Sequence, residues 1–180
     1  MPHGIVLFIG GMCFIVFLAE GAALDWSAVF LAQERGIETA YAGLGYAAFA
    51  LTMTVGRLTG DAIVRRLGAT RVIVFGGLTA AGGLFLATFA PDWEMALVGY
   101  ALLGAGCSNI VPVLYTAVGK QTVMPESIAV PAITTLGYAG ILAGPAVIGF
   151  IAHGSSLSFA FGLMAVLLVA VAIGGKVLKV

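Results

Sequence analysis

A single carboxylate interrupts the first long apolar segment of this sequence. Residues 1–19 contain no Asp, Glu, Lys or Arg, and Glu20 follows them directly, five positions before Asp25. Burying a charged carboxylate in hydrocarbon costs about 2.5–3.5 kcal/mol on insertion scales, so such a residue needs a reason to be there. We interpret Glu20 as a group that could bind and release a proton. Simple hydration of Glu20 beside Asp25 is the alternative.

Charged residues recur at four-residue spacing near the end of the next apolar segment. Arg57, Asp61 and Arg65 would place one carboxylate between two guanidinium groups on one face of a helix. Two small residues with the same spacing would let another helix approach closely: Gly56 and Gly60. The alternative is that these charges only end the helix at a membrane surface.

Uncharged polar side chains lie near the middle of two later apolar segments. Asn109 occupies one of them, and Thr134 and Tyr138 share a helix face in the other. An amide, a hydroxyl and a phenol suit a hydroxyl-rich neutral solute better than an ion, and Tyr46 could add a stacking surface for a ring. The alternative is that these groups hydrogen-bond between helices, which contributes about 0.6 kcal/mol on average.

Glycine and proline mark two places where helices could pack closely or bend. Gly140 and Gly144 are two small residues four apart, directly before Pro145. Proline lacks a backbone N–H and bends a helix, and Pro112 would do the same in an earlier segment. These positions predict either a flexible element or a static packing seam.

The sequence does not predict an enzyme. Ser108 and His153 superficially resemble the catalytic serine and histidine of a six-helix intramembrane protease. A nucleophile needs its base within hydrogen-bond reach, however, and His153 falls in a polar turn at residues 153–156 instead of inside a helix. There is no GxxxxGK[ST] phosphate loop, and the two histidines, His3 and His153, are isolated. We expect no catalytic residues, no metal site and no cofactor.

The composition requires a lipid environment for these residues. Hydrophobic residues make up 61% of the chain and charged residues only 9%, whereas soluble domains carry roughly 25% charged residues. Eight Lys and Arg balance eight Asp and Glu, so no net charge would attract nucleic acid. The expected partners are the lipid bilayer and a small solute, with no nucleic acid.

The lengths of the apolar segments predict how often the chain crosses the bilayer. A crossing needs about 20 apolar residues, and the uncharged stretch 127–175 is long enough for two. Transmembrane β-strands alternate apolar and polar residues, whereas these segments are apolar on every face. We predict an all-α membrane protein with six transmembrane helices, at residues 4–31, 40–64, 72–90, 94–118, 128–152 and 157–177.

The basic residues predict the orientation. Arg35 lies on one side of the predicted bundle, and the other side carries Arg65, Arg66, Arg71, Lys120, Lys176 and Lys179. Cytoplasmic loops are enriched in Lys and Arg. We therefore expect both termini to be cytoplasmic, with a bacterial inner membrane as the location.

Polar residues divide the predicted helices into two groups of three. The first, second, fourth and fifth helices carry polar residues, while the third and sixth carry almost none. Transporters commonly contain inverted three-helix repeats with a solute site near the bilayer midplane. The pattern predicts one bundle over residues 1–180, built from two inverted three-helix repeats at about 1–90 and 91–180.

Four segments carry a resemblance to a known family. GRLTGDAIVRRLG at 56–68 resembles the signature between the second and third helices of a half in the major facilitator superfamily. LDWSAVFL at 24–31, GAGCSNIVPVLY at 104–115 and GYAGILAGPAVIG at 137–149 resemble the seventh, tenth and eleventh helices of a sugar- or fucose-permease-like bacterial member. The resemblance implies the C-terminal six-helix half of a twelve-helix secondary transporter, whose N-terminal half is absent from this chain.

The resemblance also implies roles for particular residues and for the whole protein. Asp61 would dock at the N-terminus of a helix in the other half, where the helix dipole favours negative charge, and so latch one face shut. The latch would comprise Gly56, Arg57, Gly60, Asp61, Arg65 and Arg66, although Ala62 stands where the family often has a basic residue. The protein would move a small polar or sugar-like solute by alternating access, with proton coupling through Glu20 as a further hypothesis. A non-transporting sensor or assembly subunit is the alternative.

Overall fold

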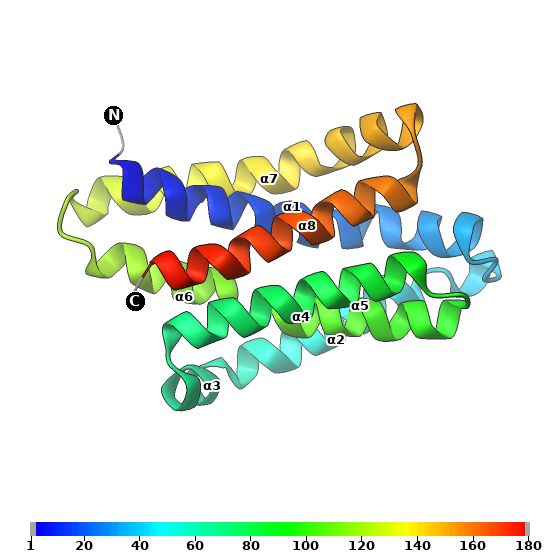
Figure 1. The fold of residues 1–180 in the computed structure, drawn as a ribbon, viewed down its shortest axis with the longest axis horizontal. Helices are drawn as coiled ribbons and strands as arrows, with labels where there is room; N and C mark the ends of the chain where they lie inside the picture. The colour runs from blue at the N-terminus through cyan, green and yellow to red at the C-terminus, as the bar shows by residue number, and fades with distance from the viewer. Residues whose placement is uncertain (1–2, 179–180) are drawn as a thin grey trace.

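The computed structural model describes residues 3–178, and within them every regular element is a helix (Figure 1). In chain order the elements are α1 (Gly4–Glu34), the short 3₁₀ helix η1 (Thr39–Tyr41), α2 (Leu44–Leu58), α3 (Gly60–Leu67), α4 (Ala69–Phe89), α5 (Trp93–Cys107), α6 (Ile110–Lys120), α7 (Glu126–Gly154) and α8 (Leu157–Val177). The all-α prediction is confirmed.

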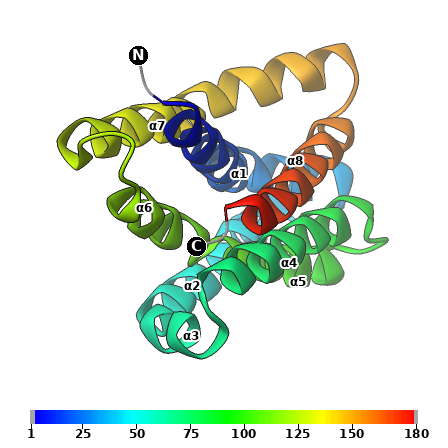
Figure 2. The same cartoon turned by 60° about the vertical axis from the view of Figure 1, so that its left-hand side comes forward.

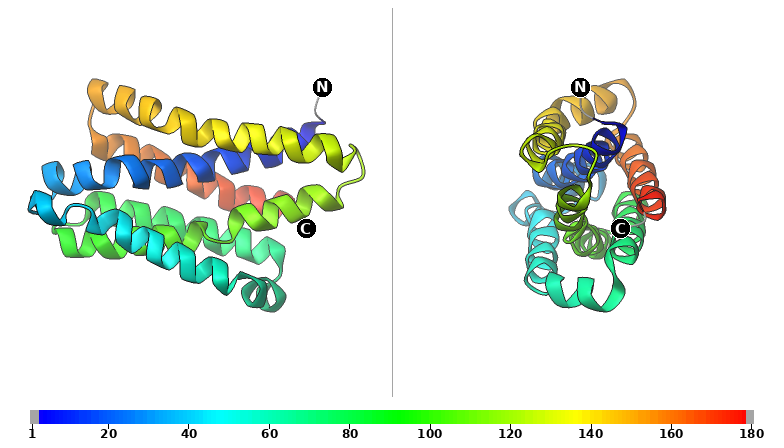
Figure 3. Two further views of the ribbon diagram at one scale, coloured as in Figure 1. Left: turned by 180° about the vertical axis from the view of Figure 1, so that it is seen from behind. Right: turned by 90° about the vertical axis from the view of Figure 1, so that its left-hand side faces the viewer.

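The long helices form a bundle in which successive crossings run in opposite directions (Figure 1). Five segments among the described residues are long and apolar enough to cross a membrane: α1, α4, α5 with α6, α7 and α8. The α2 helix runs alongside them (Figure 3, left), but its 15 residues span only about 22 Å. The start of α1 and the end of α8 lie at the same end of the bundle, next to α3 and the connection between α6 and α7 (Figure 1).

The second predicted crossing, at residues 40–64, is not one continuous helix. It begins later, at Leu44, and breaks at Thr59, after which α3 runs across the end of the bundle (Figure 3, right). The Thr59 hydroxyl donates to the Val55 carbonyl oxygen at 2.9 Å, a local bond that competes with the helical ladder. Because α3 carries charged residues, this turn lets them leave the apolar layer.

The fourth predicted crossing, at residues 94–118, is also interrupted. The helix α5 ends at Cys107, and α6 begins at Ile110. Proline cannot donate to the helical ladder, and its ring clashes with the carbonyl of the residue four positions earlier. For Pro112 that residue is Ser108, so the position of the break follows from the sequence. The α7 helix, in contrast, continues through Pro131 and Pro145.

Local sequence fixes several of the connections. Asp92 caps α5 by accepting a hydrogen bond from the Met95 backbone N–H at 3.0 Å. Ser156 caps α8 in the same way, accepting from Phe159 at 3.0 Å. Gly68, between α3 and α4, has a φ of +80°, a conformation that favours glycine. These signals explain why the connections after α3, α4 and α7 fall where the sequence predicted turns.

Glycines allow the helices to pack at close range. A Cβ atom added to Gly140 of α7 would collide with the Phe14 carbonyl oxygen of α1. Between α4 and α5, a Cβ at Gly83 would lie 2.6 Å from the Gly99 carbonyl oxygen. Backbones approach this closely only where one side chain is missing, as is typical of membrane helix pairs. The seams α1/α7 and α4/α5 therefore hold the bundle together.

Candidate functional site

A cavity of about 830 Å³ opens between the helices at the end of the bundle that carries α3. Its volume lies within the range of roughly 300–1,000 Å³ typical of ligand pockets. The residues around it come from α1, α2, α3, α6 and α7, from the start of α4 and from the break between α5 and α6 (Figure 2). The lining includes Phe17, Arg57, Gly60, Asp61, Val64, Arg65, Ala69, Asn109, Val111, Pro112, Val113, Tyr115, Thr116, Lys120, Thr134 and Tyr138.

The cavity brings together several residues that the sequence singled out separately. Asn109, Thr134 and Tyr138 line it, together with Pro112 and the charged residues Arg57, Asp61 and Arg65 of the predicted latch. The lining does not include Glu20, Tyr46, Gly56, Arg66, Gly140, Gly144 or Pro145. The cavity therefore combines uncharged polar side chains with charged ones.

Tyr138 presents a free hydroxyl to this space. Its ring stacks on Phe17 of α1, with centroids 5.6 Å apart and planes 24° from parallel. The side chain is exposed, and within residues 3–178 its hydroxyl has no hydrogen-bond partner. Stacking fixes the ring while leaving the phenol available, so Tyr138 can donate to or accept from a solute.

Thr134 and Asn109 are already engaged in hydrogen bonds. The Thr134 hydroxyl donates to the Val130 carbonyl oxygen at 2.8 Å and lies 2.9 Å from the Tyr115 hydroxyl. The Asn109 amide donates to the Gly56 carbonyl oxygen and to the Ser108 hydroxyl, both at 3.0 Å. Because an amide NH₂ has two donors, Asn109 retains only acceptor capacity for a solute.

Gly56 and Gly60 create the space that Ser108 and Asn109 occupy. A Cβ at Gly56 would collide with the Ser108 hydroxyl oxygen, and one at Gly60 would collide with the Asn109 carbonyl oxygen. The break between α5 and α6 is thus pressed against the break between α2 and α3. Two interruptions of neighbouring helices meet beside the cavity, which places irregular backbone where a polar lining can satisfy it.

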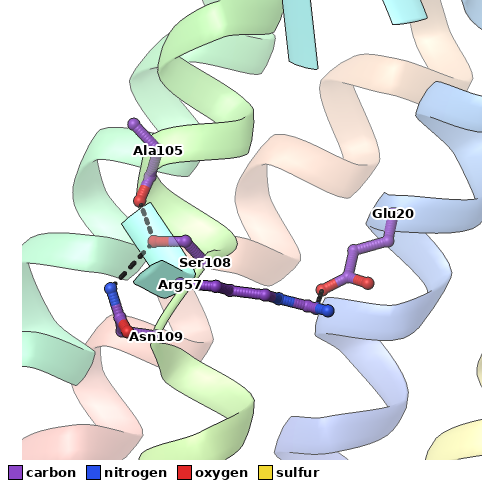
Figure 4. Close-up of polar contacts among 5 residues, drawn as sticks. All are labelled: Glu20, Arg57, Ala105, Ser108 and Asn109. Carbon is purple, nitrogen blue, oxygen red and sulfur yellow. Dashed lines mark hydrogen bonds and ion pairs between the residues drawn. The ribbon is translucent and has the colours of Figure 1, made fainter. Parts of the chain in front are cut away.

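Glu20 and Arg57 form an ion pair between α1 and α2 (Figure 4). A guanidinium nitrogen of Arg57 lies 3.6 Å from the Glu20 Oε1 atom, and the exposed fractions of the two side chains are 47% and 11%. Glu20 lies near the midpoint of α1 and not at its hydrated end. In this structure Glu20 is paired with Arg57 across two helices, which favours the interpretation of Glu20 as a functional carboxylate over simple hydration beside Asp25.

The ion pair corrects the expected arrangement of the signature charges. Arg57 belongs to α2 and Asp61 to α3, so the break at Thr59 removes them from a common helix face. Among residues 3–178, Arg57 pairs with Glu20, and Asp61 forms no ion pair with either arginine. Asp61 is instead exposed at the cavity wall, in the first turn of α3.

Tyr46 does not reach the site where a stacking surface was expected. It lies on α2 eleven residues before Arg57, which places it about 16 Å along the helix at about 1.5 Å per residue. Its ring packs against Phe49, with centroids 5.9 Å apart. The sequence pattern shows which face of α2 carries Tyr46, but it does not show how far along α2 Tyr46 lies from the cavity.

The remaining predicted positions lie at helix contacts. Gly140 and Gly144 face α1, where a Cβ at Gly144 would be 3.5 Å from a Leu18 methyl group. Pro145 is exposed within the unbroken α7, whereas Pro112 follows the break before α6. Lys179, used in the charge count, lies outside the described residues.

Ser108 and His153 are not arranged as a catalytic pair. The Ser108 hydroxyl is buried and donates to the Ala105 carbonyl oxygen at 2.7 Å. His153 is exposed in the last turn of α7, at the end of the bundle opposite α3. This separation removes the geometric basis for nucleophilic catalysis.

One basic cavity residue and one ion pair escaped the sequence reasoning. Lys120 lines the cavity with Pro112 and Thr116 because all three follow one another at four-residue spacing on α6. The same spacing could have identified Lys120. The partnership of Arg57 with Glu20 had no such signal, because the two residues are 37 positions apart on different helices.

A scan against family models identifies the fold family. A model described as Major Facilitator Superfamily matches residues 4–179. The chain belongs to the major facilitator superfamily. It is therefore an integral membrane protein of a transporter family, and not a member of an enzyme family. An uncharacterised transporter of this superfamily from Yersinia pestis is 55% identical to it over 175 residues, covering 97% of this chain and 46% of that protein.

Other relatives extend this picture. Membrane protein MosC of Rhizobium meliloti is 32% identical over 169 residues, covering 94% of this chain and 40% of that protein. The chain thus spans about half the length of the curated relatives that it matches.

Among solved structures, the E. coli fucose:proton symporter FucP matches with a TM-score of 0.85 at 16% identity, over 99% of this chain and 43% of that chain. A peptide transporter solved with sulfate matches with a TM-score of 0.77 at 20% identity, over 98% and 38%. At these identities the two structures show the fold alone.

Proposed function

We propose that this chain is the C-terminal-type half of a secondary transporter that moves a small polar solute by alternating access. The observation that carries the proposal is the 830 Å³ cavity, which combines a free phenol, an amide and charged side chains. Solute sites of such transporters lie between helices near the bilayer midplane, where broken helices supply polar groups. The meeting of the α2/α3 and α5/α6 breaks fits this arrangement.

The second half of the cavity would come from an N-terminal six-helix half. Supporting this, large apolar side chains remain exposed on α2 and α7, including Leu51, Leu58, Leu142 and Phe150. The helix pairs also support two inverted repeats at about 1–90 and 91–180. The first crossing (α1) packs on the fifth (α7), and the second (α2) packs on the fourth (α5). These two contacts are equivalent if an inverted repeat relates the first crossing to the fourth and the second to the fifth.

We propose a bacterial inner-membrane location with the α3 end cytoplasmic. Arg65, Arg66 and Lys120 lie at this end, whereas Arg35 lies at the other, where it donates to the Thr88 carbonyl oxygen.

A labelling experiment tests this orientation. Because Cys13 and Cys107 are buried, single cysteines can be introduced at Ala69 and, as a control, at Gly154 at the opposite end. In right-side-out vesicles an impermeant thiol reagent should label Gly154→Cys and spare Ala69→Cys. The reverse pattern would contradict the proposed orientation.

Asp61→Asn should disturb alternation without unfolding the protein. The Asp61 side chain is exposed and has no ion-pair partner among residues 3–178, so folding of this half should not depend on it. If Asp61 docks at a helix N-terminus of the other half, losing that charge should cost about 0.3–1 kcal/mol in one conformer and shift the two-state ratio roughly two- to fivefold.

The measurement is cysteine accessibility on both cavity faces of the complete transporter, with Glu126→Gln, an exposed acid at the same end, as the matched control. Unchanged accessibility in Asp61→Asn would argue against the latch. Accessibility that never alternates in the unmodified protein would favour the sensor or assembly subunit instead.

Tyr138→Phe should weaken solute binding without affecting stability. Its hydroxyl has no hydrogen-bond partner among residues 3–178, so removing it takes away only a bond to the solute. That loss corresponds to about 1–3 kcal/mol or a five- to hundredfold loss of affinity. Asn109→Ala should lower both affinity and thermal stability, because it also removes the bond to Gly56.

Solutes for this measurement can be found by thermal stabilisation of the complete protein, since a ligand of the folded state raises its stability. Thr79→Ala, on the outer face of α4, is the control and should change neither quantity. Normal binding by Tyr138→Phe with weakened binding by Thr79→Ala would place the solute elsewhere.

A further inference from the structure

Arg57 is only loosely held by Glu20. The two charged groups are 3.6 Å apart, which is an ion pair without a hydrogen bond, and within residues 3–178 the Arg57 guanidinium makes no hydrogen bond at all. The buried Glu20 Oε1 atom likewise has no hydrogen-bond partner there. An arginine with five unused donors is poised to bind a planar anion.

Arg57 lines the cavity, whereas Glu20 does not. The Arg57 side chain is about half exposed, and it points toward the Glu20 carboxylate, which is mostly buried (Figure 4). The same cavity holds Arg65 and Lys120 but only one acidic residue, Asp61. Even with Glu20 counted, cations outnumber anions by three to two, and a low-dielectric cleft strengthens such an excess.

We propose that the solute is a small hydroxylated carboxylate, whose carboxylate binds Arg57 in competition with Glu20 and whose hydroxyls bind the wall around Tyr138. This inference rests on the proposed transport function and names the solute class of the same cavity. It replaces the expectation of a neutral solute, which considered the amide and hydroxyl groups without the cations. A bidentate arginine–carboxylate contact is stronger and more directional than the loose internal pair.

Charge balance links this binding to a proton. When Arg57 turns to the solute carboxylate, Glu20 loses its cation and remains buried. The other ionisable groups that interact with Glu20 are the thiols of Cys13 on α1 and Cys107 on α5, and neither supplies positive charge. A proton taken from the cavity onto the Glu20 carboxylate restores neutrality, so one proton enters with each anion.

Two probes with the same ring separate charge from hydroxyl recognition. Glucuronate and glucose share the pyranose ring and differ at C6, which is a carboxylate in one and a hydroxymethyl group in the other. Binding to the complete purified transporter is measured at constant ionic strength, with proton uptake followed in weak buffer. Glucuronate should bind at least about tenfold more tightly than glucose, with uptake of one proton.

Variants locate the effect at the ion pair. Arg57→Gln should weaken glucuronate binding roughly ten- to hundredfold and leave glucose unaffected, and Arg57→Lys should give a smaller loss. Arg71→Gln, an exposed arginine in the first turn of α4 and outside the cavity lining, is the matched control. Glu20→Gln should tighten glucuronate binding about two- to fivefold and abolish proton uptake.

Equal binding of the two probes, no binding of glucuronate, or normal glucuronate binding by Arg57→Gln would overturn the inference. If Arg57→Gln does not fold, the inference can still be tested with Arg57→Lys and with the comparison of glucuronate and glucose in the unmodified protein. Glucose binding that is at least as tight as glucuronate binding in the unmodified protein would overturn the inference but leave the proposed transport function intact, with a neutral solute. Failure of the cavity to alternate would refute that function whichever probe binds.

Discussion

Glu20→Gln is expected to abolish solute accumulation driven by a pH gradient while leaving solute exchange intact. Glu20 is the mostly buried carboxylate of the α1/α2 ion pair, and glutamine keeps its shape but cannot carry a proton. One pH unit corresponds to about 1.4 kcal/mol, so each coupled proton can drive about tenfold accumulation. The variant should reach only equal concentrations on both sides.

Proteoliposomes containing the complete transporter provide the measurement, with a solute found by thermal stabilisation. Counterflow without a gradient tests whether the variant still exchanges solute. Asp25→Asn is the matched control because Asp25 lies on the same helix but is exposed and outside the cavity lining. Normal accumulation by Glu20→Gln would exclude this residue from coupling.

Gly140→Ala is expected to destabilise the protein by about 1–3 kcal/mol, although it adds a single methyl group. That methyl group would collide with the Phe14 carbonyl oxygen and lie 3.2 Å from the Leu18 backbone nitrogen. Both are backbone atoms of a packed helix, which cannot move aside as a flexible side chain could. The α1/α7 seam would have to open along its length.

Gly11→Ala is the matched control for this change. Gly11 lies on α1, but nothing lies within 4 Å of a Cβ added there, so alanine should stabilise its helix by about 0.5–1 kcal/mol. Thermal unfolding of the two variants should therefore shift in opposite directions. Equal stability of the two proteins would show that the α1/α7 seam is not closely packed at Gly140.

The sequence predicted the helical class because apolar segments of sufficient length have few other structures available in lipid. Backbone groups in hydrocarbon must be satisfied within the segment, which selects helices. It also predicted that Asn109, Thr134 and Tyr138 line a solute site, because polar groups near the middle of apolar segments are expected to face a cavity near the bilayer midplane, and all three line the cavity. The transporter family could be predicted from the signature at 56–68, which the comparison with known families confirms.

Only the tertiary structure decided how those faces meet. Helical periodicity does not specify how far one helix slides or rotates against another, so neither the pairing of Arg57 with Glu20 nor the distance of Tyr46 from the cavity could be predicted. The break at Thr59 also depends on its surroundings, since Asn109 donates to the carbonyl of nearby Gly56 and occupies the space left open by Gly60. The physical reason is that local sequence sets the face of each helix, whereas close packing between helices sets its register.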